Sequence, residues 1–339
     1  MVKLVPGSKH VIDEVSGWLR VHEDGSVDRT WSGRPEVVPL LTPVPPHSTS
    51  VNGVSVIDLP GEPNLRLYLP TSSTSPLPIL LHFQGGGFCI SHHSWFMYYQ
   101  FYSRLAAAIP AVIASVDLPL APEHRLPAAI VSSFSALLRL RSFGLSPDKN
   151  KTLPSSADFS RVFLIGDSSG GNIVHQVASL AGRIERDQPG FWYPLRVVGG
   201  IPLHPGFVRS RRSPSEARRE WETPFLTLDM LDKFLALGLP DGEGKDHPYT
   251  CPMGDEAPPM EKIHVPPMLV AVAEKDLIRD TEMEYCEAMT KAGKKVEVLF
   301  QKGVGHSFYL NKFAVDGDSI TAKRTEELIQ AIKDFVDRN

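Results

Sequence analysis

Residues 161–176 read RVFLIGDSSGGNIVHQ, and this stretch decides the fold. The apolar run at 161–167 predicts a buried strand, and the residues from 170 onward predict a helix. Between them, GDSSG matches G-x-S-x-G, the sharp strand-to-helix turn that exposes a serine hydroxyl above a sheet. Glycine on each side permits the tight backbone that such a turn needs. The stretch therefore predicts an α/β sheet with Ser168 as candidate nucleophile at its edge.

Strands and helices alternate along the chain on both sides of this turn. Short apolar runs predict strands at 78–83, 111–117, 161–167, 197–205, 267–276 and 295–301. Amphipathic stretches predict helices at 134–144, 170–185, 227–239, 280–292 and 319–337. Continuous apolar strands separated by helices indicate a mostly parallel sheet that is covered on both faces.

The first fifty residues have a different character. Residues 10–31 predict a short helix and then two strands, with Glu23-Asp24-Gly25 as the hairpin turn between the strands. The Pro-rich stretch PLLTPVPPHSTS at 39–50 predicts an extended connector. We therefore expect an N-terminal segment over residues 1–50 and a core over residues 51–339.

Composition excludes several classes of protein. A net charge of −4 over 339 residues, without a long Lys/Arg block, excludes a nucleic-acid-binding protein. The N-terminus lacks the apolar core of a signal peptide, and no stretch is apolar over the roughly 18 residues of a membrane span. Cys89, Cys251 and Cys286 are too widely spaced for a disulfide framework or a zinc site. We expect a cytoplasmic protein that uses no cofactor and no metal.

A serine hydroxyl is a weak nucleophile, so Ser168 needs a base within hydrogen-bond reach and an acid that orients the base. Asp276 ends one predicted strand and His306 follows the next, which gives the chain order serine, acid, histidine. Gly303 and Gly305 allow the loop before His306 to turn back over the sheet. These residues are the candidate catalytic group.

Other acids and histidines compete for these roles. Asp280 is interpreted as the N-terminal cap of the next helix, and Glu274 as part of the strand. His175 is interpreted as a packed or solvated helix residue, whereas His204 follows a strand end from which it can line the pocket. His82 lies near the end of the strand at 78–83 and is interpreted as structural.

Three consecutive glycines, Gly85, Gly86 and Gly87, follow the strand at 78–83. Acyl transfer creates a negative oxygen, which backbone N–H groups can approach only where no side chain blocks them. The glycine amides, together with that of Ser169, form a candidate oxyanion hole. The alternatives are an ordinary Gly-rich turn and a phosphate cradle, and the absence of G-x-x-x-x-G-K-[ST] disfavours the cradle.

Five motifs carry a resemblance to a known family: GGGF at 85–88, LAPEHRLPAA at 120–129, GDSSGGN at 166–172, DLIRD at 276–280 and GH at 305–306. With them, the chain resembles plant carboxylesterases of the hormone-sensitive-lipase-like group of α/β-hydrolases. This group also contains gibberellin receptors and hydroxyisoflavanone dehydratases. The resemblance implies an eight-stranded core sheet, a lid made by the N-terminal segment and an insertion near 205–245, and ester hydrolysis through an acyl-enzyme.

Several positions decide between an esterase and its non-hydrolytic relatives. His306 and Ser168 are those of an esterase, because the receptors replace the base histidine and the dehydratases commonly carry threonine as nucleophile. Gln84 stands where the family usually has histidine, and Pro119 and Ile130 also depart from its pattern. These departures leave open a lyase or cyclase of plant specialised metabolism, or a small-molecule binding protein.

The expected partner is a small-molecule ester, and the expected assembly is a monomer or homodimer. Aromatic residues near the motifs suggest an apolar substrate pocket, although the same residues at helical spacing are equally typical of a core. The candidate substrate-binding residues are Trp18, Gln84, Phe88, Trp95 and Phe207.

Overall fold

The computed structural model describes residues 9–71, 76–146 and 153–339, so residues 1–8 of the expected N-terminal segment lie outside it. Its main sheet has nine strands, in the order β12 (Val296–Gly305), β11 (Met268–Lys275), β10 (Val197–Leu203), β9 (Ala157–Asp167), β7 (Leu77–Phe83), β8 (Val112–Val116), β6 (Leu65–Pro70), β5 (Val54–Leu59) and β4 (His47–Val51). The strands from β12 to β8 are parallel. The last three strands continue the sheet in antiparallel pairing. The predicted mostly parallel sheet is confirmed, with nine strands instead of eight.

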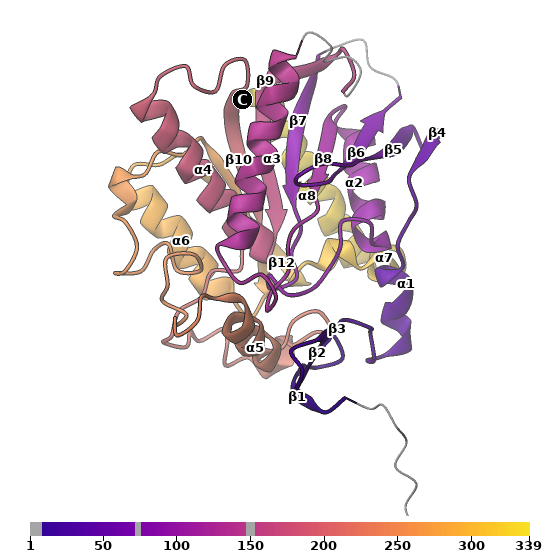
Figure 1. Ribbon diagram of the computed structural model, residues 1–339, viewed down its shortest axis with the longest axis vertical. Helices are drawn as coiled ribbons and strands as arrows, with labels where there is room; N and C mark the ends of the chain where they lie inside the picture. Colours follow the sequence, from indigo (N-terminus) through magenta and orange to yellow (C-terminus); the bar gives the residue numbers. More distant parts are fainter. Residues whose placement is uncertain (1–8, 72–75, 147–152) are drawn as a thin grey trace, which may run out of the picture.

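Helices cover both faces of this sheet (Figure 1). One face carries α3 (Ala128–Leu145), α4 (Ser169–Asp187) and α6 (Arg279–Lys291), and the other carries α2 (Phe96–Ala108) and α8 (Ser319–Arg338). Along the wholly buried β7, Ile79 and Leu81 contribute to the first core and Leu80 to the second. Because side chains alternate across a strand, both faces of the central strands must be apolar.

The N-terminal region departs from the prediction in two places. Residues 11–15 form strand β1 (Val11–Val15) and not a helix, because the chain reverses at Gly17, whose φ is 77°, and β1 then pairs with β2 (Leu19–His22). The turn expected at residues 23–25 joins β2 to β3 (Val27–Asp28), as predicted.

The Pro-rich stretch is not a plain connector. It contains the short helix α1 (Val38–Leu41), which begins with a proline in its first turn, where the missing N–H costs no hydrogen bond. It also contains β4, which pairs with β5 and supplies the ninth strand. The main sheet therefore begins inside the segment that was expected to precede the core.

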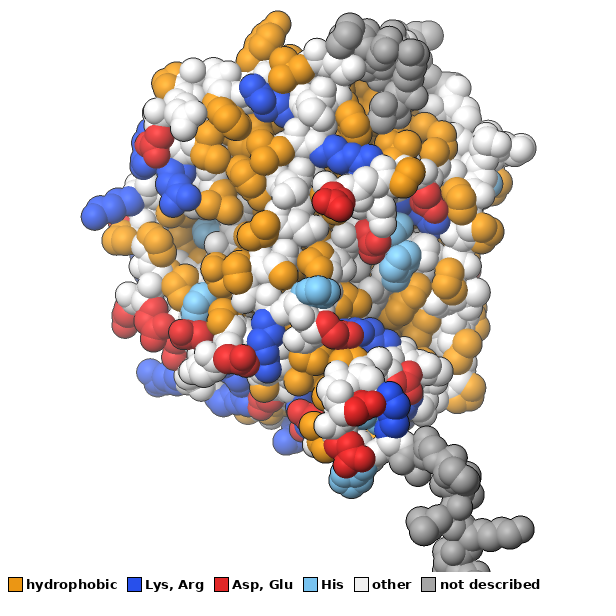
Figure 2. Space-filling model, viewed as in Figure 1, with side chains coloured by type: hydrophobic (Ala, Val, Ile, Leu, Met, Phe, Trp, Pro, Cys, Tyr) orange, Lys and Arg blue, Asp and Glu red, His pale blue; other side chains and the backbone are white. Residues whose placement is uncertain are grey.

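Among the helices in the described ranges, only α3 is long and apolar enough to cross a membrane. Its buried residues include Ala129, Ile130, Ala136, Leu137 and Leu140, which pack into the core between the helix and the sheet. One third of α3 is buried in this way, whereas Val131 and Leu145 are exposed. Figure 2 shows acidic, basic and apolar side chains interspersed on the face that carries this helix, without a continuous basic patch.

The cap, defined here as strands β1 to β3 together with α5 (Leu228–Gly238), lies at one end of the main sheet (Figure 1). Val15, Trp18 and Leu19 share an apolar cluster with Met230 and Phe234 of α5. Cys89 and Ile90, in the loop after β7, belong to the same cluster. The cap is thereby packed directly against the Gly-rich loop.

Candidate active site

Ser168 lies in a strained turn between β9 and α4, with φ 52° and ψ −121°. Its N–H donates to the Leu203 carbonyl at 2.9 Å, and its own carbonyl accepts from the Gly206 N–H at 2.9 Å. A Cβ atom on Gly170 would lie 2.0 Å from the Phe83 carbonyl oxygen, so only glycine fits there. These contacts together hold the backbone of Ser168 in an otherwise unfavourable conformation. They keep its side chain at the cavity described below.

His306 and Asp276 are in direct contact. His306 Nδ1 lies 2.6 Å from Asp276 Oδ2, and both side chains are buried. Because the carboxylate accepts at this distance, Nδ1 carries the proton and Nε2 keeps its lone pair. Asp276 is fixed in turn by the Ile278 N–H, which donates to Oδ1 at 3.1 Å. In this arrangement the His306 ring is held in a fixed orientation and its Nε2 can accept a proton.

Strand β12 reaches Gly305, so the Gly-rich loop expected before His306 is still strand. Gly303 has a φ of 84° and donates its N–H to Glu274 Oε2 at 2.8 Å, which ties β12 to β11 at that point. The turn comes at Ser307 instead, with φ 49°. His306 therefore follows directly from the strand.

Gly86 and Gly87 line the same cavity as Ser168 and His306. Within the described part of the chain, no residue accepts a backbone hydrogen bond from the amides of Gly86, Gly87 or Ser169. Gly85 lies outside the lining, contrary to expectation, because it packs beneath the loop, where a Cβ atom would meet Asp167 Oδ2 at 2.3 Å. Gly86, Gly87 and Ser169 all line the cavity together with Ser168.

Side chains around the Gly-rich loop fix its course. Gln84 donates from Nε2 to the Ser91 carbonyl at 3.2 Å, and Ser91 donates from Oγ to the Gly85 carbonyl at 2.6 Å. The Phe88 N–H donates to Ser169 Oγ at 3.3 Å. Gln84 is buried and does not line the cavity, in contrast to its predicted place in the substrate pocket. Its amide braces the loop.

His82 lies beneath the site, as a structural residue. Its Nδ1 is 2.7 Å from Ser115 Oγ, and its Nε2 is 3.3 Å from Asp167 Oδ1. Burial lowers the pKa of His82 below its ordinary value, although the nearby Asp167 opposes that shift. The neutral ring thus donates to Asp167 and holds the residue that precedes Ser168.

His204 is close to the catalytic candidates, yet it does not line the cavity as expected. The Ser307 N–H donates to His204 Nδ1 at 2.8 Å, so the proton is on Nε2. Complete burial lowers the pKa of His204 to about 3, and its ring centroid lies 6.0 Å from that of His306. The neutral ring therefore fixes the turn that carries His306.

The remaining competitors have other roles. Asp280 lies inside α6, which begins at Arg279, and accepts from the Ser215 N–H at 2.8 Å, so its predicted role as a helix cap is wrong. Glu274 is in β11, as predicted. His175 is buried and lies 2.9 Å from the Tyr285 hydroxyl, and burial lowers the pKa of His175 to about 4.

A small cavity of about 70 Å³ connects the candidate groups. Trp18, Phe225 and Phe234 close it from above, and Phe88 and Trp95 line its side. Trp18 is held by a hydrogen bond from its indole N–H to the Pro224 carbonyl at 3.3 Å.

Phe207, also expected in the pocket, lies outside this lining and is fully buried. Its ring centroid is 4.2 Å from that of Tyr285, because the chain after β10 turns the ring inward toward α6. Sequence reasoning missed Phe225 and Phe234, whose direction depends on how the cap folds over the loop.

Comparison with known proteins identifies the family of this chain. A family model described as the alpha/beta hydrolase fold matches residues 80–310. "Probable carboxylesterase 6" of Arabidopsis thaliana is 36% identical over 88% of this chain and 85% of its own length. Gibberellin receptor GID1C of the same plant is 34% identical over 82% of this chain and 83% of its own. Tuliposide A-converting enzyme b1 of Tulipa gesneriana is 30% identical over 89% of this chain and 75% of its own length.

Solved structures show the same fold at lower sequence identity. Carboxyl esterase 2 from Tuber melanosporum superposes with a TM-score of 0.67 at 21% identity, covering 85% of this chain and 89% of that protein. A bacterial heroin esterase gives a TM-score of 0.67 at 22% identity, and the match covers 84% of this chain and 86% of that protein. The chain therefore belongs to the α/β-hydrolase family, as a carboxylesterase-like member of it.

Proposed function

We propose that this protein is a serine carboxylesterase that acts on esters of short acyl groups. The observation that carries the proposal is the 2.6 Å contact between His306 Nδ1 and the buried Asp276, beside a cavity lined by Ser168 and His306. In the described residues, Ser168 Oγ has no hydrogen-bond partner; such contacts often tighten only when substrate binds.

In this mechanism, Ser168 Oγ attacks the ester carbonyl while His306 Nε2 accepts its proton. Asp276 stabilises the imidazolium that forms. The carbonyl oxygen becomes an oxyanion and receives hydrogen bonds from the amides of Gly86, Gly87 and Ser169. His306 then gives the proton to the departing alcohol, and an acyl group remains on Ser168.

Hydrolysis of the acyl-enzyme runs through the same groups in reverse order. Water attacks the acyl carbonyl while His306 removes one of its protons, and Ser168 leaves with the proton that His306 returns. Product acid and free enzyme result. The ester, one water and these groups of the chain account for every bond and proton in the two halves of the reaction.

The preference for short acyl groups follows from the cavity. The cavity of about 70 Å³ is narrow and lined by large side chains such as Trp18 and Phe234, which favours a small acyl group in this closed form. We propose that the cap is the lid of this site and that a larger ester enters only when Trp18 and α5 move away from the Gly-rich loop.

A fluorophosphonate probe tests the nucleophile, because it forms a covalent bond only with an activated serine. We expect one label on each native molecule and none on Ser168→Ala. Ser160→Ala is the matched control, since Ser160 is exposed on β9, and it should label fully.

Absence of labelling in the folded native protein would refute the esterase mechanism. That result would favour a binding protein or a lyase. A binding role is the one indicated by the name of the gibberellin receptor relative. Saturable binding of a small ligand without turnover would then be the next measurement.

We also propose a cytoplasmic location, supported by the three cysteines, which are all free and buried. The tulip relatives are described as amyloplastic, so a fluorescent fusion of the full chain is the direct test. Size-exclusion chromatography with light scattering will separate the monomer from the homodimer.

A further inference from the structure

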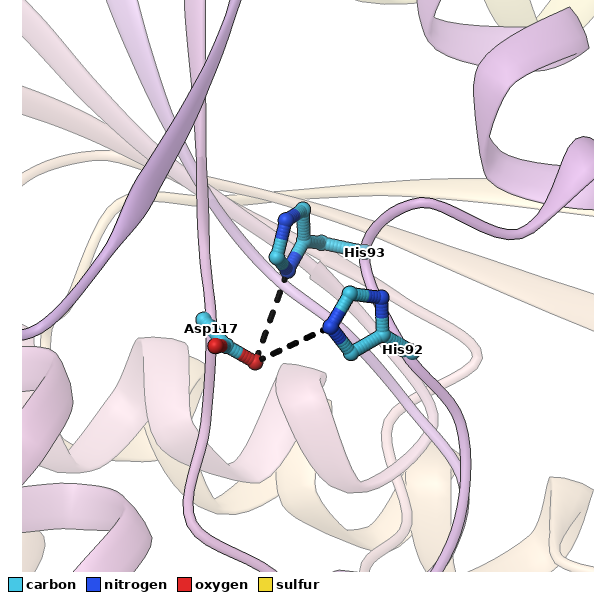
Figure 3. A group of neighbouring side chains, drawn as sticks. All are labelled: His92, His93 and Asp117. Carbon is cyan, nitrogen blue, oxygen red and sulfur yellow. Dashed lines mark ion pairs between the residues drawn. The ribbon is translucent and has the colours of Figure 1, made fainter. Parts of the chain in front are cut away.

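A second group of polar side chains lies outside the cavity (Figure 3). His92 and His93 belong to the loop between β7 and α2, and Asp117 directly follows β8. His92 Nε2 and His93 Nδ1 each lie 3.5 Å from the same oxygen, Asp117 Oδ1. Figure 3 shows both rings turned toward that oxygen. None of these three residues lines the cavity of Ser168.

His93 gives independent evidence for a ligand. Its side chain is only 6% exposed, and its buried Nδ1 makes no well-formed hydrogen bond, only a long ion-pair contact of 3.5 Å with Asp117 Oδ1. A buried polar atom that has lost its water and gained no partner destabilises the folded state. This contact with Asp117 Oδ1 is too long for a good hydrogen bond, so a metal ion bound by both atoms would satisfy both.

The spacing of the three donor atoms matches a transition-metal site. Zinc binds imidazole nitrogen and carboxylate oxygen at about 2.0–2.1 Å, so neighbouring ligands of a tetrahedral ion lie about 3.3–3.4 Å apart. The two observed separations from Asp117 Oδ1 are 3.5 Å, and all three donor atoms lie within 4.8 Å of one another. Two imidazoles exclude Ca²⁺ and Mg²⁺, which prefer oxygen ligands.

Two of the three side chains are also held from behind, as metal ligands usually are. Asn64 donates from Nδ2 to Asp117 Oδ2 at 3.2 Å, which leaves Oδ1 toward the histidines. His92 Nδ1 accepts from the Ser94 N–H at 3.2 Å, so a metal at Nε2 requires the ring proton to move to Nδ1, where Ser94 Oγ, 2.7 Å away, can accept it. An ion can enter from solvent, because the His92 side chain is 46% exposed and Asp117 lines a surface groove.

We propose that His92, His93 and Asp117 bind one Zn²⁺-class ion, with solvent as the fourth ligand. The sequence did not suggest this site, because its zinc patterns rest on paired ligands at regular spacing, whereas Asp117 comes from a different strand. The ion links the end of β8 to the loop that also carries Gly86 and Gly87. It is a structural clamp on that loop and takes no part in acyl transfer.

The test is calorimetric titration of Zn²⁺ into the full chain after chelator treatment. We expect one equivalent to bind to the native protein, and affinity to fall by about 100-fold or more in His92→Ala, His93→Ala and Asp117→Ala. His124→Ala is the control for an exposed histidine and should bind like the native protein. Co²⁺ in place of zinc should give the intense visible bands of a four-coordinate ion.

The donor atoms of His204, Asp276 and His306 are equally close, so the test must distinguish that group from the proposed site. We therefore expect His306→Gln to retain one tight site and His92→Ala to lose it. His92 is half-exposed, so this variant should fold, which its unfolding temperature without metal will verify. Zinc should raise the unfolding temperature of the native protein but not of His92→Ala. Unchanged stoichiometry and affinity in His92→Ala and Asp117→Ala would overturn the proposal.

Discussion

Gly86→Ala is the sharpest perturbation of the candidate oxyanion hole. Gly86 has a φ of 103°, and a Cβ atom there would lie 2.4 Å from the Ile90 carbonyl oxygen. An ordinary contact is 3.4 Å or more, so loop and carbonyl must separate by about 1 Å. Because the contact is with the backbone carbonyl oxygen of Ile90, no side-chain rotation can relieve the clash.

A shift of this size removes the amide from hydrogen-bond reach of the oxyanion. Loss of one such donor lowers turnover by about 100- to 1,000-fold, or about 2.7–4 kcal/mol of transition-state stabilisation. The substrate carbonyl is uncharged and depends less on this donor, so we expect the loss in kcat, with KM changed little.

The assay is p-nitrophenyl acetate hydrolysis under saturating substrate, with unfolding measured in parallel. Gly53→Ala is the matched control: Gly53 also has a positive φ, 81°, but open space surrounds its Cβ position. Both variants should lose about 1–2 kcal/mol of stability from the left-handed backbone. Gly53→Ala should keep native turnover. If Gly86→Ala folds and keeps more than a third of native kcat, the assignment of the hole is wrong.

Three further outcomes are expected. Asp276→Asn should lower kcat about 10,000-fold, because the amide no longer fixes the His306 tautomer; a native rate would contradict the base assignment. Trp18→Ala should raise the p-nitrophenyl butyrate-to-acetate ratio of kcat/KM by about tenfold, while an unchanged ratio would show that Trp18 does not limit the acyl group. Burial, assisted by Asp276, raises the pKa of Glu282 well above 4.5, so the folded state keeps a proton that the unfolded state loses, and stability falls as pH rises. Glu282→Met should therefore stabilise the protein more at about pH 8 than at about pH 4.5, which thermal unfolding at both pH values measures.

Much of the fold follows from local patterns. The strands of the parallel sheet and the helices after Ser168 were predicted because apolar runs and amphipathic stretches report burial within a few residues of themselves. Errors gathered in the first fifty residues, where five-residue strands and single-turn helices leave too little pattern, and helix α2 (Phe96–Ala108) was not predicted. Whether 11–15 pairs with 19–22 depends on the turn at Gly17 and on the packing of Val15 against the cap.

The candidate site also contains residues that local sequence patterns predict and residues that they do not. Ser168 and the glycines around it are marked by a turn whose backbone demands particular residues, and the order of Asp276 and His306 follows from strand ends that meet at one edge of a parallel sheet. Phe207 was assigned to the pocket on the basis of its residue type alone. The direction of such a ring is decided by its neighbours, here Tyr285.

The sequence by itself determined the strained serine turn, the free glycine amides and the alternation that builds the sheet, because each depends on residues adjacent in the chain. Only the tertiary structure decided which buried groups support the site and what closes it. His204 behind His306, Trp18 above Ser168, and Asp117 between two histidines of another loop all come together through contacts between distant elements. Such contacts depend on how whole layers pack, and no local pattern of residues encodes them.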